Sequence, residues 1–300
     1  MPAPQLNSGI FHEAWGARTF VMGILNITPD SFSGDGLLSA SDALSDAVAG
    51  TERAIQQAGR YLAAGADILD VGGESTRPGS QTLSQEAELE RVLPVIKALS
   101  HQFPQAVLSV DTYKADVAEQ AILAGAQIVN DVWGLRADPQ LAEVVARYQV
   151  PVILMHNRSQ AINAQVQANL GGRYVGMDYD DLLEDVKREL LESVDLALTA
   201  GVARQKIILD PGIGFGKTVE QNLELLNRLP EIRALGFPIL LGPSRKSFIG
   251  YTLNLPPDQR VEGTAAAVSV GIVRGADIIR VHDVEMMVRV ARMTDAIARR

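Results

Sequence analysis

Short runs of valine, isoleucine and leucine alternate along this chain with longer amphipathic stretches, and this alternation limits the possible folds more than any other feature. Continuous apolar runs are typical of strands buried on both faces of a parallel sheet, and the stretches between them are typical of covering helices. Eight such runs predict a single (β/α)8 barrel of the TIM type, in the α/β class. The runs are residues 20–27, 68–72, 106–110, 127–129, 150–155, 206–209, 238–241 and 277–281.

The runs follow one another without a change of composition that would mark a linker. A chain of 300 residues could hold two domains, but α/β barrels commonly occupy this length as one. We therefore predict an N-terminal extension over residues 1–18 and one barrel domain over residues 19–300.

The positions of polar residues indicate where two helices start and where one long loop lies. Thr82 with Gln85, and Thr218 with Gln221, have the spacing of a capping box, in which each side chain bonds the other residue's backbone. Residues 157–177 are polar and follow the fifth run. We predict a long loop there, and a helix that begins near Asp178.

Composition narrows the classes of function. A formal net charge of −9 argues against nucleic acid or an anionic membrane as the main partner. The lack of cysteine excludes disulfides, thiolate catalysis and Cys-ligated metals, and the four histidines lack the spacing of a zinc site. The first residues do not have the pattern of a secretory signal, and no apolar run reaches membrane-spanning length. We therefore predict a cytoplasmic protein.

Each predicted strand is followed by polar residues. In a parallel barrel the carboxyl ends of all strands open on one face, so these residues are expected to converge at one mouth. A single polar residue beside a strand is as often a loop cap, but polar ends on every strand favour a site for a small anionic molecule. The residues are Asn26, Thr28, Pro29, Asp30, Asp70, Glu74, Ser75, Thr76, Arg77, Asp111, Asn130, Asp131, His156, Asp210, Ser244, Arg245, Lys246, Arg280, His282 and Asp283.

The chemistry of this set predicts the kind of ligand. Asp111, Asn130 and Asp210 offer acceptors and an amide, which suit a heterocycle with N–H donors and a carbonyl. Four other residues are cations suited to phosphate or carboxylate oxygens, namely Arg77, Lys246, Arg280 and His282. A purely structural salt-bridge role for Arg280 and His282 is the alternative.

A glycine-rich segment over residues 212–218 looks like a phosphate-binding loop, but Pro211 stands where that motif requires its first glycine. Two interpretations of these glycines stay open. They let the backbone approach a flat ligand, or let Phe215 turn into the mouth; alternatively, they form a plain flexible loop.

The strand-end segments together resemble the motifs of the dihydropteroate synthases, a branch of the pterin-binding (β/α)8 family. The resemblance extends over residues 19–283, and NITPDSFS, DVGGESTRPG and SRKSF are its most specific motifs. The matching segments are NITPDSFS (26–33), DVGGESTRPG (70–79), SVDT (109–112), ND (130–131), LMH (154–156), DPGIGFGK (210–217), SRKSF (244–248) and RVHD (280–283).

The resemblance implies an activity in folate biosynthesis. The family condenses (7,8-dihydropterin-6-yl)methyl diphosphate with 4-aminobenzoate, gives 7,8-dihydropteroate and diphosphate, and requires Mg²⁺. It also implies a homodimer. No covalent enzyme nucleophile is needed for this reaction, which agrees with a chain that shows no nucleophile–base motif.

The resemblance also implies roles for individual residues. Asn26 would bind Mg²⁺, and the groups acting in catalysis would be Lys246, Arg280, His282 and Asp111. The pterin diphosphate would contact Thr76, Asp111, Asn130, Asp210, Lys246, Arg280, Val281 and His282. The 4-aminobenzoate would contact Thr76, Arg77, Pro78, Ser247, Phe32 and Phe215.

The first motif departs from the family at one point, because the family continues it as Ser-Asp-Gly-Gly whereas this chain has Ser-Gly-Asp-Gly, with the acid at Asp35. Two other functions are weighed against the synthase. A corrinoid-dependent methyltetrahydrofolate methyltransferase would not need the TPDSFS and SRKS loops that are present here. A non-catalytic pterin-binding protein is disfavoured by a set of residues that is intact here, namely Asn26, Arg77, Lys246, Arg280 and His282.

Overall fold

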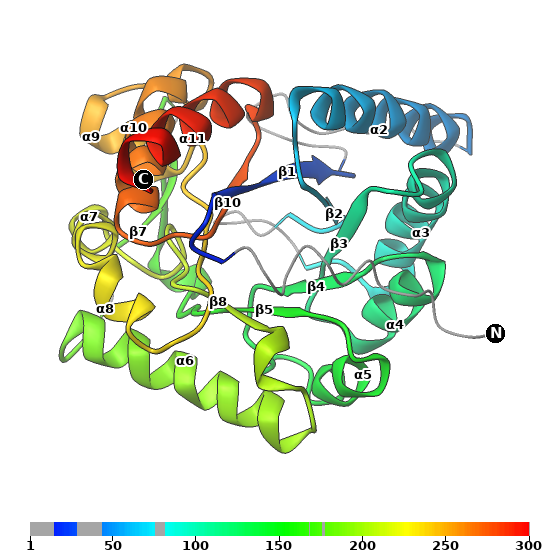
Figure 1. Ribbon diagram of the computed structural model, residues 1–300, viewed down its shortest axis with the longest axis horizontal. Coiled ribbons are helices and arrows are strands. Elements are labelled where there is room, and N and C mark those ends of the chain that lie inside the picture. The colour runs from blue at the N-terminus through cyan, green and yellow to red at the C-terminus, as the bar shows by residue number, and fades with distance from the viewer. Residues whose placement is uncertain (1–14, 29–43, 76–81, 168, 176–177, 300) are drawn as a thin grey trace.

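The computed structural model describes residues 15–28, 44–75, 82–167, 169–175 and 178–299. Eight parallel strands form the central sheet in chain order, and helices surround them (Figure 1), which confirms the predicted barrel. The strands of the barrel are β1 (Phe20–Asn26), β2 (Ile68–Gly72), β3 (Val107–Asp111), β4 (Ile128–Asp131), β5 (Val152–Met155), β8 (Ile207–Asp210), β9 (Leu240–Leu241) and β10 (Ile278–Val281). Each lies within two residues of its prediction at either end.

Helices follow the strands and pack on the outside of the sheet. The described helices are α2 (Leu44–Ala64), α3 (Gln85–Gln102), α4 (Ala115–Ala124), α5 (Gln140–Tyr148), α6 (Leu182–Thr199), α7 (Val219–Asn227), α8 (Leu229–Arg233), α9 (Ser247–Leu253), α10 (Val261–Val273) and α11 (Val284–Ala298). Among these helices, none is long and apolar enough to cross a membrane.

The barrel closes between β8 and β9. Regular pairing of β9 covers only Leu240 and Leu241 and joins this strand to β10. On its other side, Ile239 forms a parallel bridge with Leu209, and the Leu209 N–H donates to the Pro238 carbonyl at 2.9 Å. The eight strands therefore enclose an interior that side chains must fill.

The amino-terminal half of this interior is an apolar floor. Every barrel strand contributes to one buried cluster that contains no helix residue, so the cluster lies inside the barrel, and Trp15 packs against it. Its members are Phe20, Met22, Ile68, Val107, Ile128, Ile153, Ile208, Leu240 and Ile278. These residues shut one end of the barrel with hydrocarbon.

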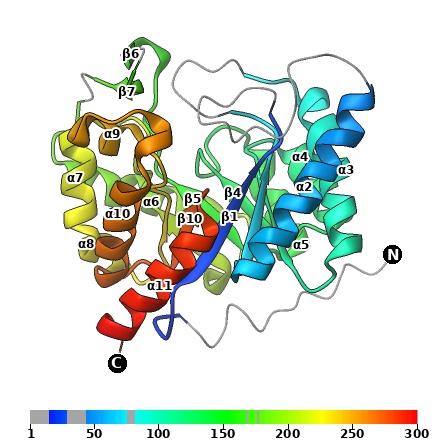
Figure 2. The same cartoon turned by 90° about the horizontal axis from the view of Figure 1, so that it is seen from above.

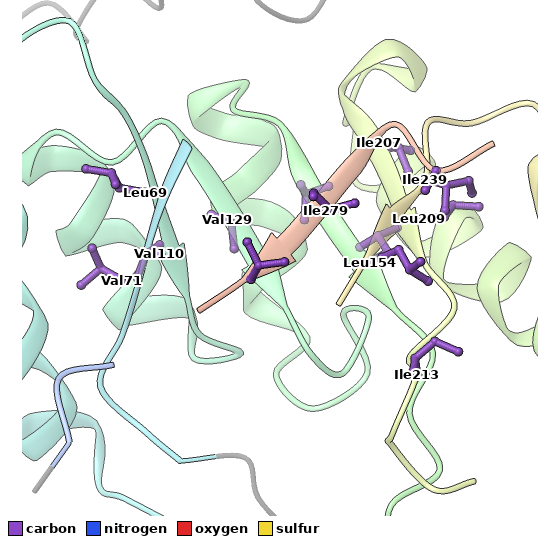
Figure 3. Close-up of a cluster of buried hydrophobic side chains, with 14 of the residues drawn as sticks. Leu69, Val71, Val110, Val129, Leu154, Ile207, Leu209, Ile213, Ile239 and Ile279 are labelled. Carbon is purple, nitrogen blue, oxygen red and sulfur yellow. The ribbon is translucent and has the colours of Figure 1, made fainter. Parts of the chain in front are cut away.

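Neighbouring positions on the same strands point outward. Leu69, Val129, Leu154 and Ile279 belong to a larger cluster that includes helix residues such as Leu190, and Figure 3 shows these strand residues along the barrel wall. Successive side chains of a strand point to opposite faces, so this alternation fixes which residues face the interior. The same alternation decides the direction of the polar residues further along each strand.

The segment after β5 is not the plain loop that the sequence predicts. It contains a short antiparallel hairpin of β6 (Ala164–Gln167) and β7 (Gly171–Tyr174). Figure 2 shows this hairpin beyond the end of the barrel that lies away from the C-terminus, close to α9. β6 leaves most of its side chains exposed, which explains why its sequence lacks the apolar pattern of the barrel strands.

Helix starts were predicted correctly at one site and wrongly at two. Thr218 and Gln221 form the expected capping box ahead of α7. The cap of α3 is Ser84 rather than Thr82, since the Ser84 hydroxyl accepts from the Ala87 N–H. α6 begins at Leu182 rather than near Asp178, because the Asp181 carboxylate caps the amides of the first turn.

Candidate active site

A polar layer lies directly above the apolar floor, because on five of the strands the inward-facing position two residues further along is polar or charged instead of apolar. Ile68 is followed at this spacing by Asp70, and Ile278 by Arg280. Val107 and Ile128 are followed in the same way by Ser109 and Asn130, and Ile208 by Asp210. The predicted convergence at one mouth is therefore confirmed for Asp111, Asn130, Asp210 and Arg280.

Arg280 joins two carboxylates at the centre of this layer. Its Nε donates to Asp70 Oδ2 at 2.6 Å, and its Nη2 donates to Asp111 Oδ2 at 2.5 Å. The Asn130 amide also donates to Asp70 Oδ2, at 3.0 Å. These ion pairs use two of the five N–H donors of the guanidinium, which leaves donor capacity for anionic oxygens of a ligand.

Asp70 was placed at the mouth by the sequence, but no role was predicted for it. It is fully buried and holds both Arg280 and Asn130 in place. Within the described part of the chain, Asp70 Oδ1 and the neighbouring Ser109 hydroxyl are buried without a hydrogen-bond partner. Such atoms are rare in folded proteins and indicate a place where a ligand or water binds. The sequence signal was a carboxylate two positions after Ile68, on the inward face.

Burial opposes the ionisation of two carboxylates of the layer, Asp210 and Asp111. Burial raises the pKa of Asp210 to about 6, although its Oδ1 accepts the Gly212 N–H at 2.7 Å. Burial also raises the pKa of Asp111, against the opposing pull of Arg280. A ligand that is cationic or donates N–H groups would therefore stabilise the carboxylate form of both residues.

Asp131 is different, although it stands directly after Asn130 at the end of β4. Its carboxylate accepts the backbone amides of Trp133 and Leu135, at 2.8 and 2.5 Å. Burial raises its pKa to about 6 against these bonds. Asp131 thus shapes the turn after β4, which is the loop-cap role expected for some of the strand-end residues.

Lys246 and Phe215 meet above the polar layer. The Lys246 ammonium lies 3.8 Å from the centroid of the Phe215 ring, in cation–π geometry. Gly214 makes this approach possible, since a Cβ at that position would lie 2.7 Å from Lys246 Cδ. Phe215 also packs with Val132 and Met155 in a small apolar cluster. The glycines of this segment therefore serve close packing, with Phe215 turned toward Lys246.

Lys217 holds the same loop from below. Its ammonium is buried and donates to the carbonyls of Gly212 and Phe215 at 3.0 and 3.1 Å, and it lies 2.9 Å from His156 Nδ1. Burial lowers the pKa of Lys217 to about 7 and that of His156 to about 3. Lys217 therefore binds carbonyls of its own glycine-rich loop. His156 supports Lys217 and does not reach the mouth of the barrel.

His282 is oriented by Ser244 at the rim of the layer. The Ser244 hydroxyl lies 3.0 Å from His282 Nδ1 and accepts the His282 backbone N–H at 3.1 Å. Tyr61 donates its hydroxyl proton to the His282 carbonyl at 2.8 Å. Val281, between Arg280 and His282, is buried in the barrel wall, so only its backbone can face a ligand.

A family model described as pterin binding enzyme matches residues 22–282 of this chain. The chain belongs to the pterin-binding enzyme family. The match begins within β1 and ends one residue after β10, so it includes most of β1 and all of the other barrel strands.

Proteins similar to this chain in sequence and in structure support this family assignment. The chain is 50% identical to a dihydropteroate synthase of Clostridium beijerinckii, over 95% of this chain and 96% of that protein. It is 47% identical to a dihydropteroate synthase of Bacillus subtilis, over 93% and 88% of the two chains. A crystal structure of a Clostridium difficile dihydropteroate synthase, obtained in the presence of pteroic acid, has a TM-score of 0.83 at 46% identity and covers 96% of this chain and 100% of that one.

Some residues predicted for a pterin-binding enzyme cannot be placed. Phe32, Asp35, Thr76, Arg77 and Pro78 lie outside the described residues. Ser247 is described, as the half-buried first residue of α9, directly after Lys246.

Asn26 is the last residue of β1 and lies beside Gly72 in the register of β2. Within the described ranges, no three His, Cys, Asp or Glu side chains gather in a way that could hold a metal ion. Mg²⁺ commonly binds through one or two protein oxygens and the phosphates of its substrate. The Asn26 amide oxygen fits an ion that arrives with a diphosphate, and does not by itself make a resident metal site.

Proposed function

We propose that the chain is a dihydropteroate synthase. It joins (7,8-dihydropterin-6-yl)methyl diphosphate to 4-aminobenzoate and releases 7,8-dihydropteroate and diphosphate. The observation that carries this proposal is the layer of Asp70, Asp111, Asn130, Asp210 and Arg280 above a sealed apolar floor. This arrangement offers acceptors and a cation to one ligand at the carboxyl-terminal end of the barrel strands.

The pterin ring is assigned to the polar layer. Its N–H groups would donate to Asp111 and Asp210, and the Asn130 amide could accept or donate at the ring edge. Phe215 and Met155 offer apolar contact to a flat ring beside these groups. Burial raises the pKa of Asp111 and Asp210, and the ring would supply hydrogen-bond donors to both carboxylates. Binding of the ring and ionisation of these carboxylates therefore favour each other.

The reaction forms a bond between the arylamine nitrogen and the pterin methylene carbon. The bond from that carbon to the diphosphate oxygen breaks, its electron pair leaves with the diphosphate, and the amine loses a proton. Positive charge develops on the methylene and ring, where Asp111 and Asp210 stabilise it. Arg280 and His282 face the negative charge that gathers on the leaving diphosphate. No covalent intermediate with the enzyme is required.

The 4-aminobenzoate is assigned to the outer part of the mouth. Lys246, Phe215 and Ser247 lie next to one another there, and Thr76, Arg77, Pro78 and Phe32 are proposed to complete this side. A cation lying over an aromatic ring suits a substrate that has both a ring and a carboxylate.

We further propose that Mg²⁺ takes part, with Asn26 as one ligand. When bound, the ion would neutralise part of the charge of the diphosphate. The residues of the chain then orient the two substrates, while the apolar floor excludes water from the amino-terminal end of the barrel.

A homodimer in the cytoplasm is also proposed. The helices α10 and α11 pack on each other, and both expose large apolar side chains, which would suit a subunit contact. These side chains are Val270, Val273, Met286, Met293 and Ile297. The absence of cysteine agrees with a reducing compartment.

The proposed function is tested by measuring release of diphosphate from purified protein. We expect turnover only when the pterin diphosphate, 4-aminobenzoate and Mg²⁺ are all present. Folded protein that binds the pterin in calorimetry without releasing diphosphate would establish the non-catalytic alternative. Methyl transfer from methyltetrahydrofolate to a corrinoid would establish the methyltransferase alternative.

Affinity for the pterin is expected to fall as the pH is lowered. Asp210 binds ring N–H groups as a carboxylate, and its pKa is raised to about 6, so protonation below that pH competes with the ligand. A single competing proton weakens binding about tenfold per pH unit below the pKa. Calorimetric titrations between about pH 5 and pH 8 measure this slope.

Asp210→Asn is the matched control for the pH experiment, because its amide has nearly the same shape and does not titrate. We expect weaker binding at pH 8 and a shallower slope below pH 6, with the remaining slope due to Asp111. A wild-type slope in Asp210→Asn would remove Asp210 from the pterin site.

A further inference from the structure

Arg260 is a buried cation outside the polar layer, at the residue before α10. Its side chain donates three hydrogen bonds, all to backbone carbonyls. Nε donates to Leu255 at 3.1 Å, Nη1 to Arg245 at 3.0 Å, and Nη2 to Leu170 at 2.8 Å. In the part of the chain that the structure describes, no carboxylate forms a salt bridge with it. Burying a charge costs free energy of desolvation, so a buried arginine without a carboxylate partner indicates a role beyond filling space.

The sequence makes room for this guanidinium at a second position. Gly250 lies inside α9, where glycine is unfavourable, and a Cβ at Gly250 would overlap the guanidinium of Arg260. The helix thus carries a glycine at a position where a side chain would displace Arg260.

One of the three carbonyls, that of Arg245, belongs to a strained turn. Arg245 has φ of +54°, a left-handed conformation that is uncommon for a residue other than glycine. Arg260 holds its carbonyl, and Thr264 Oγ1 accepts its N–H at 3.0 Å. The next two residues are Lys246 and Ser247, so the direction of both follows from this turn. Such strain persists only where surrounding contacts enforce it.

Another of the three carbonyls, that of Leu170, belongs to the β6–β7 hairpin. Leu170 lies in its turn, and Tyr251 of α9 donates to the adjacent Gly171 carbonyl at 3.2 Å. Arg173 of β7 lies over the Tyr251 ring, 4.4 Å from its centroid. The hairpin is therefore fastened to the helix that begins at Ser247, in agreement with its place beside α9 in Figure 2.

We propose that Arg260 is a positioning residue that links the β6–β7 hairpin to the Arg245 turn and so sets the directions of Lys246 and Ser247 on the 4-aminobenzoate side of the site. The inference rests on the proposed function for the identity of the substrate. The link itself is a property of the fold and is open to a separate measurement.

Kinetics of four variants test the role. Arg260→Met is expected to raise KM for 4-aminobenzoate at least tenfold while the Kd for the pterin diphosphate changes less than twofold. Gly250→Ala should produce the same selective rise, because its methyl displaces the unaltered arginine. Arg260→Lys keeps the charge but cannot reach three carbonyls, and should lie between Arg260→Met and wild type. Tyr251→Phe is the matched control, since it removes a hairpin contact and spares the Arg245 turn, and it should stay within twofold of wild type.

A rise of the two substrate constants by the same factor, or a folded Gly250→Ala with wild-type kinetics, would overturn the proposal. If Arg260→Met does not fold, Gly250→Ala and Arg260→Lys still decide the question.

Hydrogen exchange tests the link without any activity. In Arg260→Lys, amides of the hairpin and of residues 244–248 should exchange faster together, whereas Tyr251→Phe should affect the hairpin alone. Faster exchange in only one of the two segments of Arg260→Lys would show that they are not linked. The two proposals can fail separately. If the wild type shows no turnover but both segments exchange faster in Arg260→Lys, the proposed function is refuted and the structural link is supported.

Discussion

Replacing Arg280 with alanine is expected to lower the free energy of unfolding by about 3–5 kcal/mol and to lower kcat/KM by a factor of about 10²–10³. The loss of stability arises because Asp70 and Asp111 would remain buried without their common cation. The loss of activity arises because the leaving diphosphate would lose a charged donor. Urea denaturation measures the first effect, and diphosphate release measures the second.

Two further variants separate these effects. Arg280→Lys keeps a positive charge near Asp70 but lacks the forked geometry, so it should recover part of the stability and little of the activity. Arg289→Ala is the control, because Arg289 is exposed on α11 and pairs only with Glu285 among the contacts described. It should change the free energy of unfolding by less than about 0.5 kcal/mol. Wild-type turnover in a folded Arg280→Ala would show that the Arg280 cluster is purely structural.

Replacing Lys246 with methionine is expected to lower kcat/KM by a factor of about 10²–10³ with little change in stability. Methionine keeps the hydrocarbon that packs on Gly214, but it removes the charge that lies over Phe215 and acts on Asp210. Steady-state kinetics with each substrate varied in turn will locate the loss.

Lys206→Met is the matched control for this change. Lys206 precedes β8, so it lies at the opposite end of the barrel, where its ammonium bonds the Gln149 carbonyl. The same substitution there should leave kcat/KM within twofold of wild type. If Lys246→Met is equally harmless, the cation over Phe215 has no part in the reaction.

The barrel and its polar end could be predicted because both depend on short-range patterns. Eight apolar runs mark the strands, and the polar residue that follows each run inherits its direction from the alternation of side chains. The predictions for Asp111, Asn130, Asp210 and Arg280 needed no knowledge of distant contacts. Only their mutual bonding required the structure.

What could not be predicted depends on contacts between residues far apart in the sequence. The β6–β7 hairpin has little apolar pattern of its own, and it is held by Tyr251 and Arg260, which lie 80 and 90 residues from the carbonyls they bind. Pro211 already excluded a phosphate-binding loop, but the supporting role of Lys217 appears only in its contact with His156, 61 residues away. Asp70 stood inside an apolar strand, where its partner Arg280 is 210 residues distant.

The alternation of floor, wall and polar layer has a consequence for how such a chain can change over evolution. Deleting one residue within β2 would turn Asp70 toward the helices and send Leu69 or Val71 into the site, so both packing and chemistry would fail together. An insertion after β5, by contrast, adds residues to a hairpin that is attached to the barrel at a few points. Length variation among descendants of this chain should therefore accumulate in the loops at the mouth, while the strands keep a constant length.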